Sequence, residues 1–561
     1  WMQNYCLDHL FPEWSIWEQF VTEDQAGALR LDALLSSHPI QVPIKHAKEV
    51  EEVFDAISYL KGASVVRLIY SYLGHENFQK GLQAYMAKHK YSNALTNQLW
   101  QAWADVSGMP VRDVMATWTE QMGYPVVTVT KVEWAEDLSK ATLSLEQKWF
   151  IADGSDKSEQ KNKLWSIPLM ATMGDNDGEL IHLGVMSDRK MKVDVELPKG
   201  RKTWIKLNGQ QHVPMRVNYE PVAEEFTVLF SDAILSKDMI ANDRAGLLLD
   251  SYALAKAGSV DPGSLITLLS AFQKEDTMPV YSAMEEVLIG LKKIVQNSSP
   301  ELNARFQQFG ASIIKETADR LGWDSQEDDG HLTALLRSTV VRLTAAFLAD
   351  DADVQKEAIE RFEKYAEDPV NNHAELSSDI KTSVVRIVLG STDDADYYEK
   401  CLELIDLAET TQAKKELYLA MGAAKSMDLK KRTLDWCTSG VLKKQDFFYA
   451  IGSVSASGKD GLDLTWTYLQ ENFDRIVDMI RTASPSLLAA TVLNSCGSFA
   501  SDDKADEIEK FFETHKNEHP VPLIKRKVDQ IIEGTRASAK FLKSIEESKT
   551  FEQNLDKKGM L

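Results

Sequence analysis

The sequence has 561 residues, too many for one hydrophobic core, since domains average roughly 150 residues and three or four units are therefore expected. Hydrophobic residues make up 44% of the chain and charged residues 26%, a composition that excludes fibrous and disordered classes and fits an ordinary globular protein. With 63 Lys and Arg against 85 Asp and Glu, the net charge is -22, and a field of this sign repels nucleic acid and anionic membranes.

The first 123 residues have the spacing of amphipathic helices. Apolar residues recur at intervals of three and four along a helix that is expected to begin near Pro12 and to stop before Pro39. The same spacing marks residues 65–72, and Gly74 is expected to end that helix, because glycine tolerates the left-handed conformation common at helix ends. Further helices are expected up to Gly123, where the period changes.

Short strands are expected between residues 124 and 219. Residues 126–132 are almost entirely β-branched, and turns rich in Asp, Gly and Asn separate the runs that follow. Regular short strands of this kind favour a small antiparallel β-sandwich. The expected strands are residues 126–132, 141–145, 164–170, 180–183, 190–195, 203–207 and 213–217.

From about residue 222 to the end, amphipathic helical segments follow one another with short polar connections. Consecutive helices without strands favour a curved α-helical solenoid of the HEAT or armadillo kind, although no fixed sequence repeat is present. The concave side of such a stack is a suitable wall for a peptide chamber. Examples of the segments are residues 244–257, 263–272, 283–295, 334–348 and 413–421.

The cysteines give an expectation about location. They are scattered and form no CxxC pair, which favours buried, reduced thiols over a disulfide framework and predicts a cytoplasmic protein. No apolar run reaches the roughly 18 residues that a membrane-spanning helix needs. A membrane is therefore not expected as a partner, and the negative net charge makes nucleic acid an unexpected partner as well. The cysteines are Cys6, Cys401, Cys437 and Cys496.

One segment carries a specific resemblance. Residues 52–64 read Glu-Val-Phe-Asp-Ala-Ile-Ser-Tyr-Leu-Lys-Gly-Ala-Ser. This run is similar to the Phe-Asp-x-Ile-Ser-Tyr-x-Lys-Gly-Ala signature of the gluzincin zinc aminopeptidases, the family of the puromycin-sensitive and alanyl aminopeptidases. Other segments resemble the same family in the same order, most densely before residue 125. They are residues 7–14, 31–40, 117–125, 320–323 and 330–337.

In that family the tyrosine of the signature lies in the active site, and the resemblance gives this role to Tyr59. Its phenol would donate a hydrogen bond to the oxyanion that forms when water attacks the scissile peptide carbonyl, which makes Tyr59 the candidate transition-state stabiliser. One such donor is worth roughly 3–4 kcal/mol. Without the surrounding signature, Tyr59 would be interpreted as an ordinary aromatic residue at the start of a helix.

The metal-binding part of the family's machinery is absent from this sequence. The resemblance implies one zinc ion, held by an HExxH motif and by a glutamate on the next helix, but no HExxH occurs here. The glutamate would lie just before the position that matches Trp1, where the chain starts without Met. The expectation is a C-terminal fragment of a zinc metallo-aminopeptidase, inactive alone, with peptides as substrates and the missing N-terminal part as a partner.

Two other sequence features contain possible metal ligands. Residues 515–519, His-Lys-Asn-Glu-His, match the inverted zinc motif HxxEH, but a proline follows directly and a solvated loop is the favoured interpretation. His38, before Pro39, is expected to make a local hydrogen bond rather than a metal bond. A function of another class also stays open, namely a non-catalytic helical scaffold or peptide-binding module.

Together these patterns predict a multidomain, mainly α-helical protein. Residues 1–123 would be the helical remainder of a thermolysin-like catalytic domain, residues 124–219 the antiparallel β-sandwich, and residues 220–561 the helical solenoid. The predicted function of the intact parent is the removal of N-terminal residues from peptides in the cytoplasm.

Overall fold

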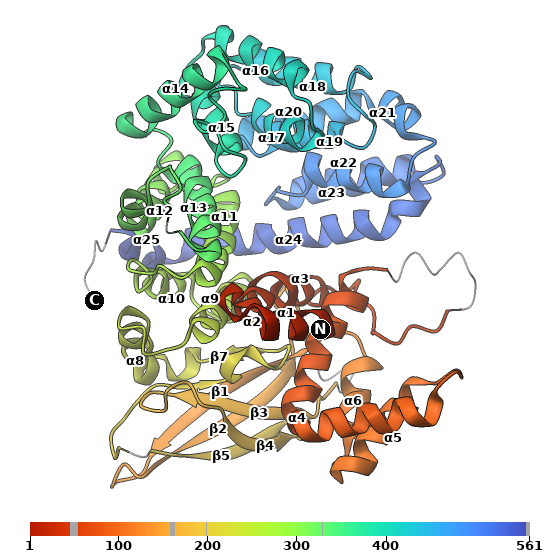
Figure 1. Ribbon diagram of the computed structural model, residues 1–561, viewed down its shortest axis with the longest axis vertical. Coiled ribbons are helices and arrows are strands. Elements are labelled where there is room, and N and C mark those ends of the chain that lie inside the picture. The colour runs from red at the N-terminus through yellow and green to blue at the C-terminus, as the bar shows by residue number, and fades with distance from the viewer. Residues whose placement is uncertain (45–53, 157–162, 198, 328, 557–561) are drawn as a thin grey trace. The chain divides into compact units, whose positions relative to one another are not determined.

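The computed structural model describes residues 1–44, 54–156, 163–197, 199–327 and 329–556. The chain divides into two compact units, one from Trp1 to Met284 and another that begins at Glu285. This boundary lies inside one helix, α11 (Met278–Val295). Figure 1 labels the elements of both units.

The first unit begins with helices whose large aromatic side chains are buried. Trp103 of α5 and Trp118 of α6 are inaccessible to solvent. A Cβ added at Gly81 of α4 would lie 2.1 Å from the Trp103 ring, so α4 and α5 are in close contact. Helix α4 continues past the predicted end at Gly74 with a break in its backbone there. The helical elements are α1 (Met2–Leu10), η1 (Pro12–Trp14), α2 (Ile16–Phe20), η2 (Val21–Gln25), α3 (Ala26–Asp32), η4 (Ile57–Lys61), α4 (Gly62–His89), α5 (Thr96–Ser107) and α6 (Val111–Thr119).

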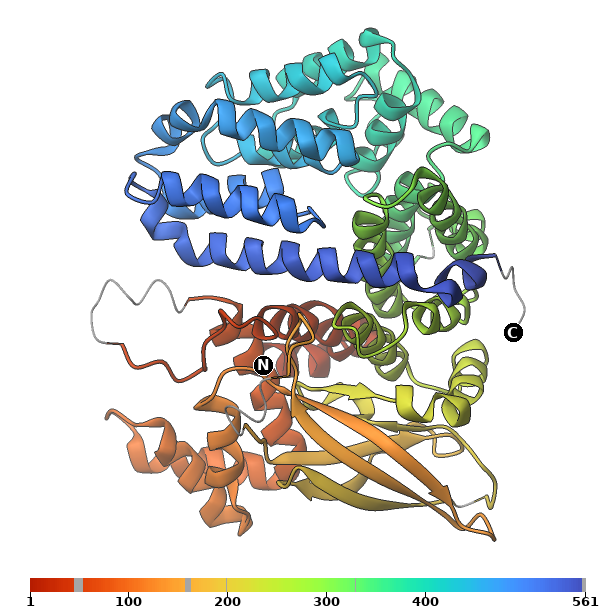
Figure 2. The ribbon, with the colours of Figure 1, turned by 180° about the vertical axis from the view of Figure 1, so that it is seen from behind.

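Seven strands then form two sheets, which lie one against the other in Figures 1 and 2. The strand orders are β5-β2-β1-β7 and β4-β3-β6. Every residue of β3 is buried, whereas β4 and β5 alternate between exposed residues and residues that are half-buried or buried. The strands are β1 (Pro125–Trp134), β2 (Lys140–Trp149), β3 (Ile167–Met173), β4 (Ile181–Met186), β5 (Lys190–Glu196), β6 (Ile205–Leu207) and β7 (Arg216–Asn218).

The prediction of a wholly antiparallel sandwich is wrong for one pair. Strand β7 pairs parallel to β1, with Val127 opposite Val217. The chain reaches β7 from β6, a strand of the other sheet, and not through a hairpin from β1, and parallel neighbours need such a crossover. The seven predicted strands all overlap observed strands, while the three-domain division stays a prediction.

Helix α9 joins the sheets to the first helices within the same unit. It contacts β7 and also the η2 segment. Its Asp250 accepts hydrogen bonds from Arg216 Nη1 at 3.0 Å and from the Val217 N–H at 3.1 Å. Both charged side chains are buried, so this pair fixes the end of β7 on the helix. The remaining elements of this unit are η5 (Gly209–Gln211), η6 (Glu220–Val222), α8 (Ala223–Leu235), α9 (Ala241–Lys256) and α10 (Pro262–Ser270).

The second unit consists of helices, and one series of them forms a chain of successive contacts. Helices α13, α15, α17, α19, α22 and α24 each contact the next of this series, and α12, α14, α16, α18 and α23 each contact a member of it. The helices are α12 (Pro300–Leu321), α13 (His331–Phe347), α14 (Ala352–Glu367), α15 (Lys381–Ser391), α16 (Ala395–Leu407), α17 (Thr411–Met421), α18 (Met427–Cys437), α19 (Phe447–Ser455), α20 (Lys459–Glu471), α21 (Phe473–Ile480), α22 (Pro485–Cys496), α23 (Asp502–Thr514), η7 (Val521–Ile524), α24 (Lys525–Glu547) and α25 (Lys549–Leu555).

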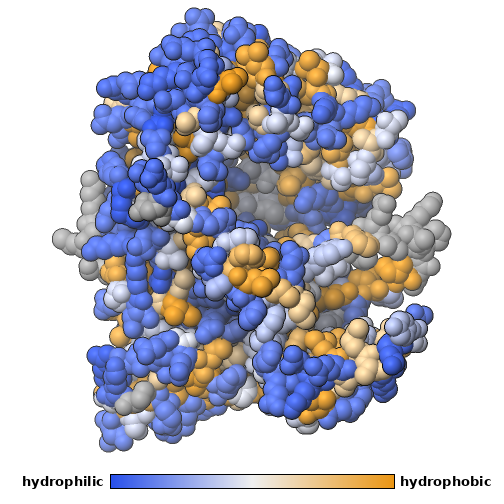
Figure 3. Space-filling model, in the orientation of Figure 1, coloured by the Kyte–Doolittle hydropathy of each residue, from blue (hydrophilic) through white to orange (hydrophobic). Residues whose placement is uncertain are grey.

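The chain is mainly helical with small sheets, as the sequence predicted. On the face shown in Figure 3, apolar residues lie in small separate patches among hydrophilic ones. None of the described helices is alone long and apolar enough to cross a membrane, although the bent pair α13 and α14 together passes a test of length and composition. Three of the four cysteines are buried as predicted, but Cys6 is exposed.

Candidate active-site region

Tyr59 lies in the short η4 segment that leads into α4, and its side chain is exposed. Its relative accessibility is 60%, and its ring approaches only the ring of Phe54 among the described aromatic residues, at 6.0 Å between centroids. The phenol oxygen has no hydrogen-bond partner among the described residues. Glu52 and Val53 of the signature lie outside the described residues. Tyr59 therefore presents a free O–H donor to solvent and does not pack into a core.

Asp55 fixes the start of the segment that carries Tyr59. Its Oδ1 accepts hydrogen bonds from the N–H groups of Ile57 at 2.9 Å and Ser58 at 3.1 Å, and its backbone carbonyl accepts from the Tyr59 N–H at 3.1 Å. These bonds satisfy donors that a helix start leaves without intrahelical partners. The orientation of the first turn is therefore set by a side chain four positions before the tyrosine.

A histidine from a distant segment holds Asp55 in turn. His38 Nε2 lies 2.8 Å from Asp55 Oδ2, and His38 Nδ1 lies 2.7 Å from the carbonyl oxygen of Pro39. The second contact confirms the predicted local hydrogen bond of His38. Burial alone would raise the pKa of Asp55, but the hydrogen bonds from His38, Ser58 and Ile57 outweigh it and hold that pKa below its ordinary value.

A buried ion pair anchors the other end of the same segment. Lys61 Nζ lies 2.9 Å from Asp32 Oδ2, with both side chains 1% exposed, and it donates to the Gly123 carbonyl at 3.1 Å. Asp32 Oδ1 accepts from the Gly123 N–H at 2.9 Å and from the Ser37 hydroxyl at 2.6 Å. The segment is thus tied to α3 and to Gly123, two residues before the first strand.

The segment that carries Tyr59 is also unusual in its backbone. Both η4 and η2 are π-helical, and the two contact each other. Single π-turns inside α-helices occur frequently at functional sites. Sequence reasoning singled out Tyr59 and gave no role to Asp32, Asp55 or Lys61. The sequence could have indicated Asp55 and Lys61, because both belong to the signature around Tyr59. Asp32 lies far from the signature in sequence and contacts Lys61 only in the folded chain.

Comparison with known families matches both units of the chain. The model described as "Peptidase family M1 domain" matches residues 1–118, and the model described as "ERAP1-like C-terminal domain" matches residues 204–537. The second match alone covers more than half of the 561 residues. The chain belongs to the M1 aminopeptidase family. This confirms the resemblance to a C-terminal portion of an M1 aminopeptidase, on which the role of Tyr59 rests.

Similar M1 proteins occur in plants and yeast. The chain is 32% identical to Aminopeptidase M1-B of Oryza sativa, over 99% of the chain and 61% of the relative. It is 33% identical to Aminopeptidase M1 of Arabidopsis thaliana, with the same shares covered. It is 29% identical to the Alanine/arginine aminopeptidase of Saccharomyces cerevisiae, over 91% of the chain and 57% of the relative. The chain therefore spans about three fifths of the length of these relatives.

M1 peptidases are zinc enzymes, but the described residues around Tyr59 do not fit a zinc ion. Zinc in proteins needs three or four close histidine, cysteine or carboxylate ligands. Among the described residues, one group has ligand atoms close enough, namely Asp474, His515 and Glu518 in the second unit. The described residues around Tyr59 therefore offer hydrogen-bond donors and acceptors but no metal site.

The inverted motif at residues 515–519 contributes to that group only in part. His515 Nδ1 lies 2.9 Å from Glu518 Oε2, while His519 does not belong to the group. The His515 ring lies against the rings of Phe473 and Phe511 at 4.7 and 4.6 Å. Residues 516–519 are exposed turns after α23, as the interpretation of a solvated loop expects.

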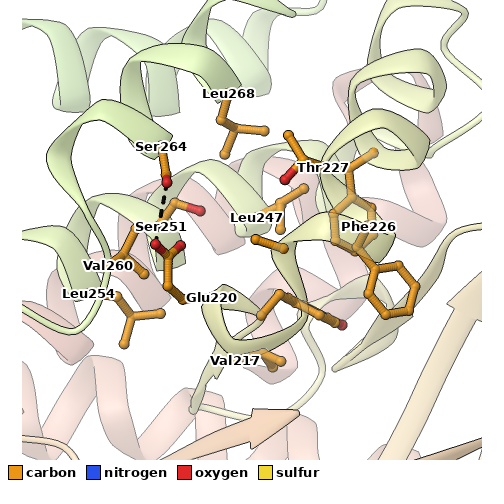
Figure 4. A pocket seen from close by; sticks show the side chains of 13 residues that line it. Val217, Glu220, Phe226, Thr227, Leu247, Ser251, Leu254, Val260, Ser264 and Leu268 are labelled. Atoms are coloured by element: carbon orange, nitrogen blue, oxygen red, sulfur yellow. Dashed lines mark hydrogen bonds between the residues drawn. The ribbon is translucent and has the colours of Figure 1, made fainter. Parts of the chain in front are cut away.

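A second site in the first unit is too small for a peptide. Apolar side chains of β7, α8, α9 and α10 line a pocket of about 70 Å³, and Figure 4 shows Glu220 at its edge beside Ser264. Burial raises the pKa of Glu220, while weak hydrogen bonds from the Asp261 N–H and the Ser264 hydroxyl oppose this. Pockets for drug-sized ligands enclose about 300–1,000 Å³. Tyr59 does not line this pocket.

Proposed function

We propose that this chain is part of a zinc-dependent aminopeptidase that removes N-terminal residues from peptides. The proposal is supported by membership of the M1 family and by one observation, the exposed phenol of Tyr59. This phenol has no partner among the described residues and lies on a segment held at both ends. The zinc ligands would come from outside this chain, and the chain alone would be inactive. The remainder of the same protein is therefore its proposed partner.

Tyr59 would act on the oxyanion of the tetrahedral intermediate. When water attacks the scissile carbonyl, negative charge moves to the carbonyl oxygen, and a neutral O–H donor aimed at that oxygen stabilises the charge. The donor helps only if its position does not change during the reaction, since reorganisation would cost part of the gain. The bonds of Asp55 and the buried Lys61–Asp32 pair restrict the backbone of the segment in this way.

The architecture would support this activity. Residues 1–123 are proposed as the remainder of the catalytic domain, residues 124–219 as the β-sandwich, and residues 220–561 as a HEAT-like solenoid. The contact series from α13 to α24, in which inner helices contact one another and outer helices flank them, supports the solenoid. Its concave side would confine peptide substrates. A cytoplasmic location is proposed from the scattered cysteines, which form no disulfide among the described residues.

The test uses the full-length parent that contains the metal-binding part. Replacing Tyr59→Phe removes the donor and keeps the ring, so we expect kcat on an aminoacyl fluorogenic amide to fall about 10²–10³-fold with a smaller change in KM. Tyr91→Phe is the matched control, because Tyr91 is an exposed tyrosine as well, and it should keep full activity. A loss of less than about tenfold for Tyr59→Phe, in a variant with an unchanged melting temperature, contradicts the assigned role.

A further inference from the structure

In the second unit, a cluster of cationic side chains lines a cavity of about 410 Å³. Its walls come from α11, α13 and α15 and from the residues at the ends of α17, α19 and α22. All of these residues belong to the second unit. Apart from the cations, most of the wall is made of alanine, serine, threonine and glycine, which leaves space between the helices and offers hydroxyl and backbone groups to a ligand.

Four cationic side chains line this cavity, and among the described residues only Arg342 forms an ion pair with an acid. Arg342 forms a bidentate ion pair with Glu285, at 2.8 Å for both bonds. Lys292 donates to the Gln307 side chain at 3.2 Å and to the carbonyl of Ala346. Glu285 is the one acidic residue among the described residues that line the cavity.

The other two cations, Lys293 and Arg386, have no hydrogen bond or ion pair from their side chains to any described residue. Arg386 is half-buried on α15, and Lys293 on α11 is exposed to the water of the cavity. A guanidinium that is partly withdrawn from water and has no partner among the described residues keeps an uncompensated desolvation cost. A site that tolerates this cost in the free protein is suited to an anion.

The electrostatics of the cluster agree with this geometry. Burial lowers the pKa of Arg386. Burial and, to a smaller extent, the charge of Arg386 lower the pKa of Lys292 to about 8, while Asp350 opposes the shift. Although Lys293 is exposed to the cavity, protein surrounds it on most sides, and this burial together with Arg386 lowers its pKa as well. The cations repel one another, and a bound anion would relieve that repulsion.

We propose that this cavity binds a small phosphate-bearing molecule with two or more negative charges, held by Arg386 and Lys293 with Lys292 beside them. A guanidinium fork matches the oxygen geometry of phosphate, and a lysine adds a mobile point charge. A single carboxylate, which is the charge of a peptide C-terminus, would leave most of the cluster unneutralised. The proposal does not depend on the chemistry of the proposed peptidase function, because the site involves neither Tyr59 nor a metal.

The experiment measures binding of inorganic phosphate and pyrophosphate to the full chain by calorimetry at near-physiological salt. We expect saturable binding, tighter for pyrophosphate, that weakens at least tenfold in Arg386→Gln and in Lys293→Gln. Lys293 is exposed, so its variant tests the site even if Arg386→Gln fails to fold. Lys431→Gln removes a surface lysine of α18 that pairs with Asp435, and it should bind pyrophosphate like the unchanged protein.

A second measurement locates the ligand. Pyrophosphate should protect Lys293 from acetylation at pH 8 and leave Lys431 equally reactive with and without the ligand. A peptide C-terminus is the other source of anionic oxygens that this cavity could bind. Binding of a short peptide with a free C-terminal carboxylate is therefore compared with binding of the same peptide as its C-terminal amide. Binding of the peptide acid without binding of pyrophosphate overturns the proposal. Equal weakening in Lys431→Gln overturns it too, since it shows general attraction to surface cations.

Discussion

Lys61 and Asp32 face each other in the interior of the first unit, and neither charge has access to water. Removal of one partner from such a pair leaves an uncompensated buried charge, which costs about 3–5 kcal/mol. We therefore expect Lys61→Met to lower the free energy of unfolding by that amount, measured by urea denaturation. The control Lys80→Met breaks an exposed pair with Glu76 and should change stability little, because surface pairs contribute little. Similar effects of both variants contradict the anchoring role of Lys61.

The pH dependence of the site follows from Asp55. Its pKa is lower in the folded protein than its ordinary value of about 3.9, so its contribution to stability is fully present above that value and is lost as pH falls through the folded pKa. We expect the stability difference between the unchanged protein and Asp55→Asn to shrink as pH falls below about 4. Urea unfolding at each pH measures this. If the stability difference between the two proteins stays constant down to pH 3, the folded protein does not specifically stabilise the ionised form of Asp55.

The candidate site was predictable to the extent that it lies in one continuous run of sequence. The signature identified Tyr59, and the Pro39 neighbour identified the hydrogen bond of His38. The pairing of His38 with Asp55 and of Lys61 with Asp32 joins separate segments, and no local pattern records which carboxylate a lysine will meet. The same reason hid Lys293 and Arg386, which lie on different helices and share a cavity only after folding.

At the scale of elements, the Gly→Ala substitution is expected to change stability in opposite directions at two positions in the second unit. A Cβ at Gly422, at the end of α17, would lie 2.1 Å from the backbone nitrogen of Val454 in α19. Backbone cannot move aside cheaply, so we expect Gly422→Ala to destabilise the protein by about 1–3 kcal/mol. Gly534 in α24 has no heavy atom within 4 Å of its added Cβ, and Gly534→Ala should stabilise the helix by about 0.5–1 kcal/mol. Thermal unfolding of both variants gives the two signs, and a loss of stability in Gly534→Ala contradicts the open environment at that position.

Elements were easier to predict from the sequence than their pairing. Residues 126–132 formed a strand as expected, because β-branched side chains fit a pleated, half-buried surface. The parallel pairing of β7 with β1 could not be derived, since a three-residue strand carries no directional signal and its partner is far away in sequence. Gly74 was predicted as a helix end, and the backbone does leave the helical conformation there, but the next helix resumes at once within α4.

At the scale of the whole molecule, the second unit contains a core cluster of its own. That cluster includes Val388, Trp466 and Ile508, and all of its buried residues lie in the second unit, from α13 to α24. The Lys61–Asp32 pair belongs to the first unit and Gly422 to the second. A defect in one core should therefore loosen its own unit more than the other, since stability is not uniform across a structure.

Hydrogen exchange of backbone amides followed by mass spectrometry tests this last expectation. Lys61→Met should speed exchange in α3 and α4 by at least tenfold, with smaller changes in α17 and α19, because about 1.4 kcal/mol of lost local stability corresponds to a tenfold change in the open population. Gly422→Ala should show the reverse pattern. If each variant speeds exchange equally in both units, the chain unfolds as one cooperative body, and the boundary inside α11 does not separate two units in energetic terms. A difference confined to one unit per variant supports that boundary, because the shared helix α11 then fails to transmit either defect.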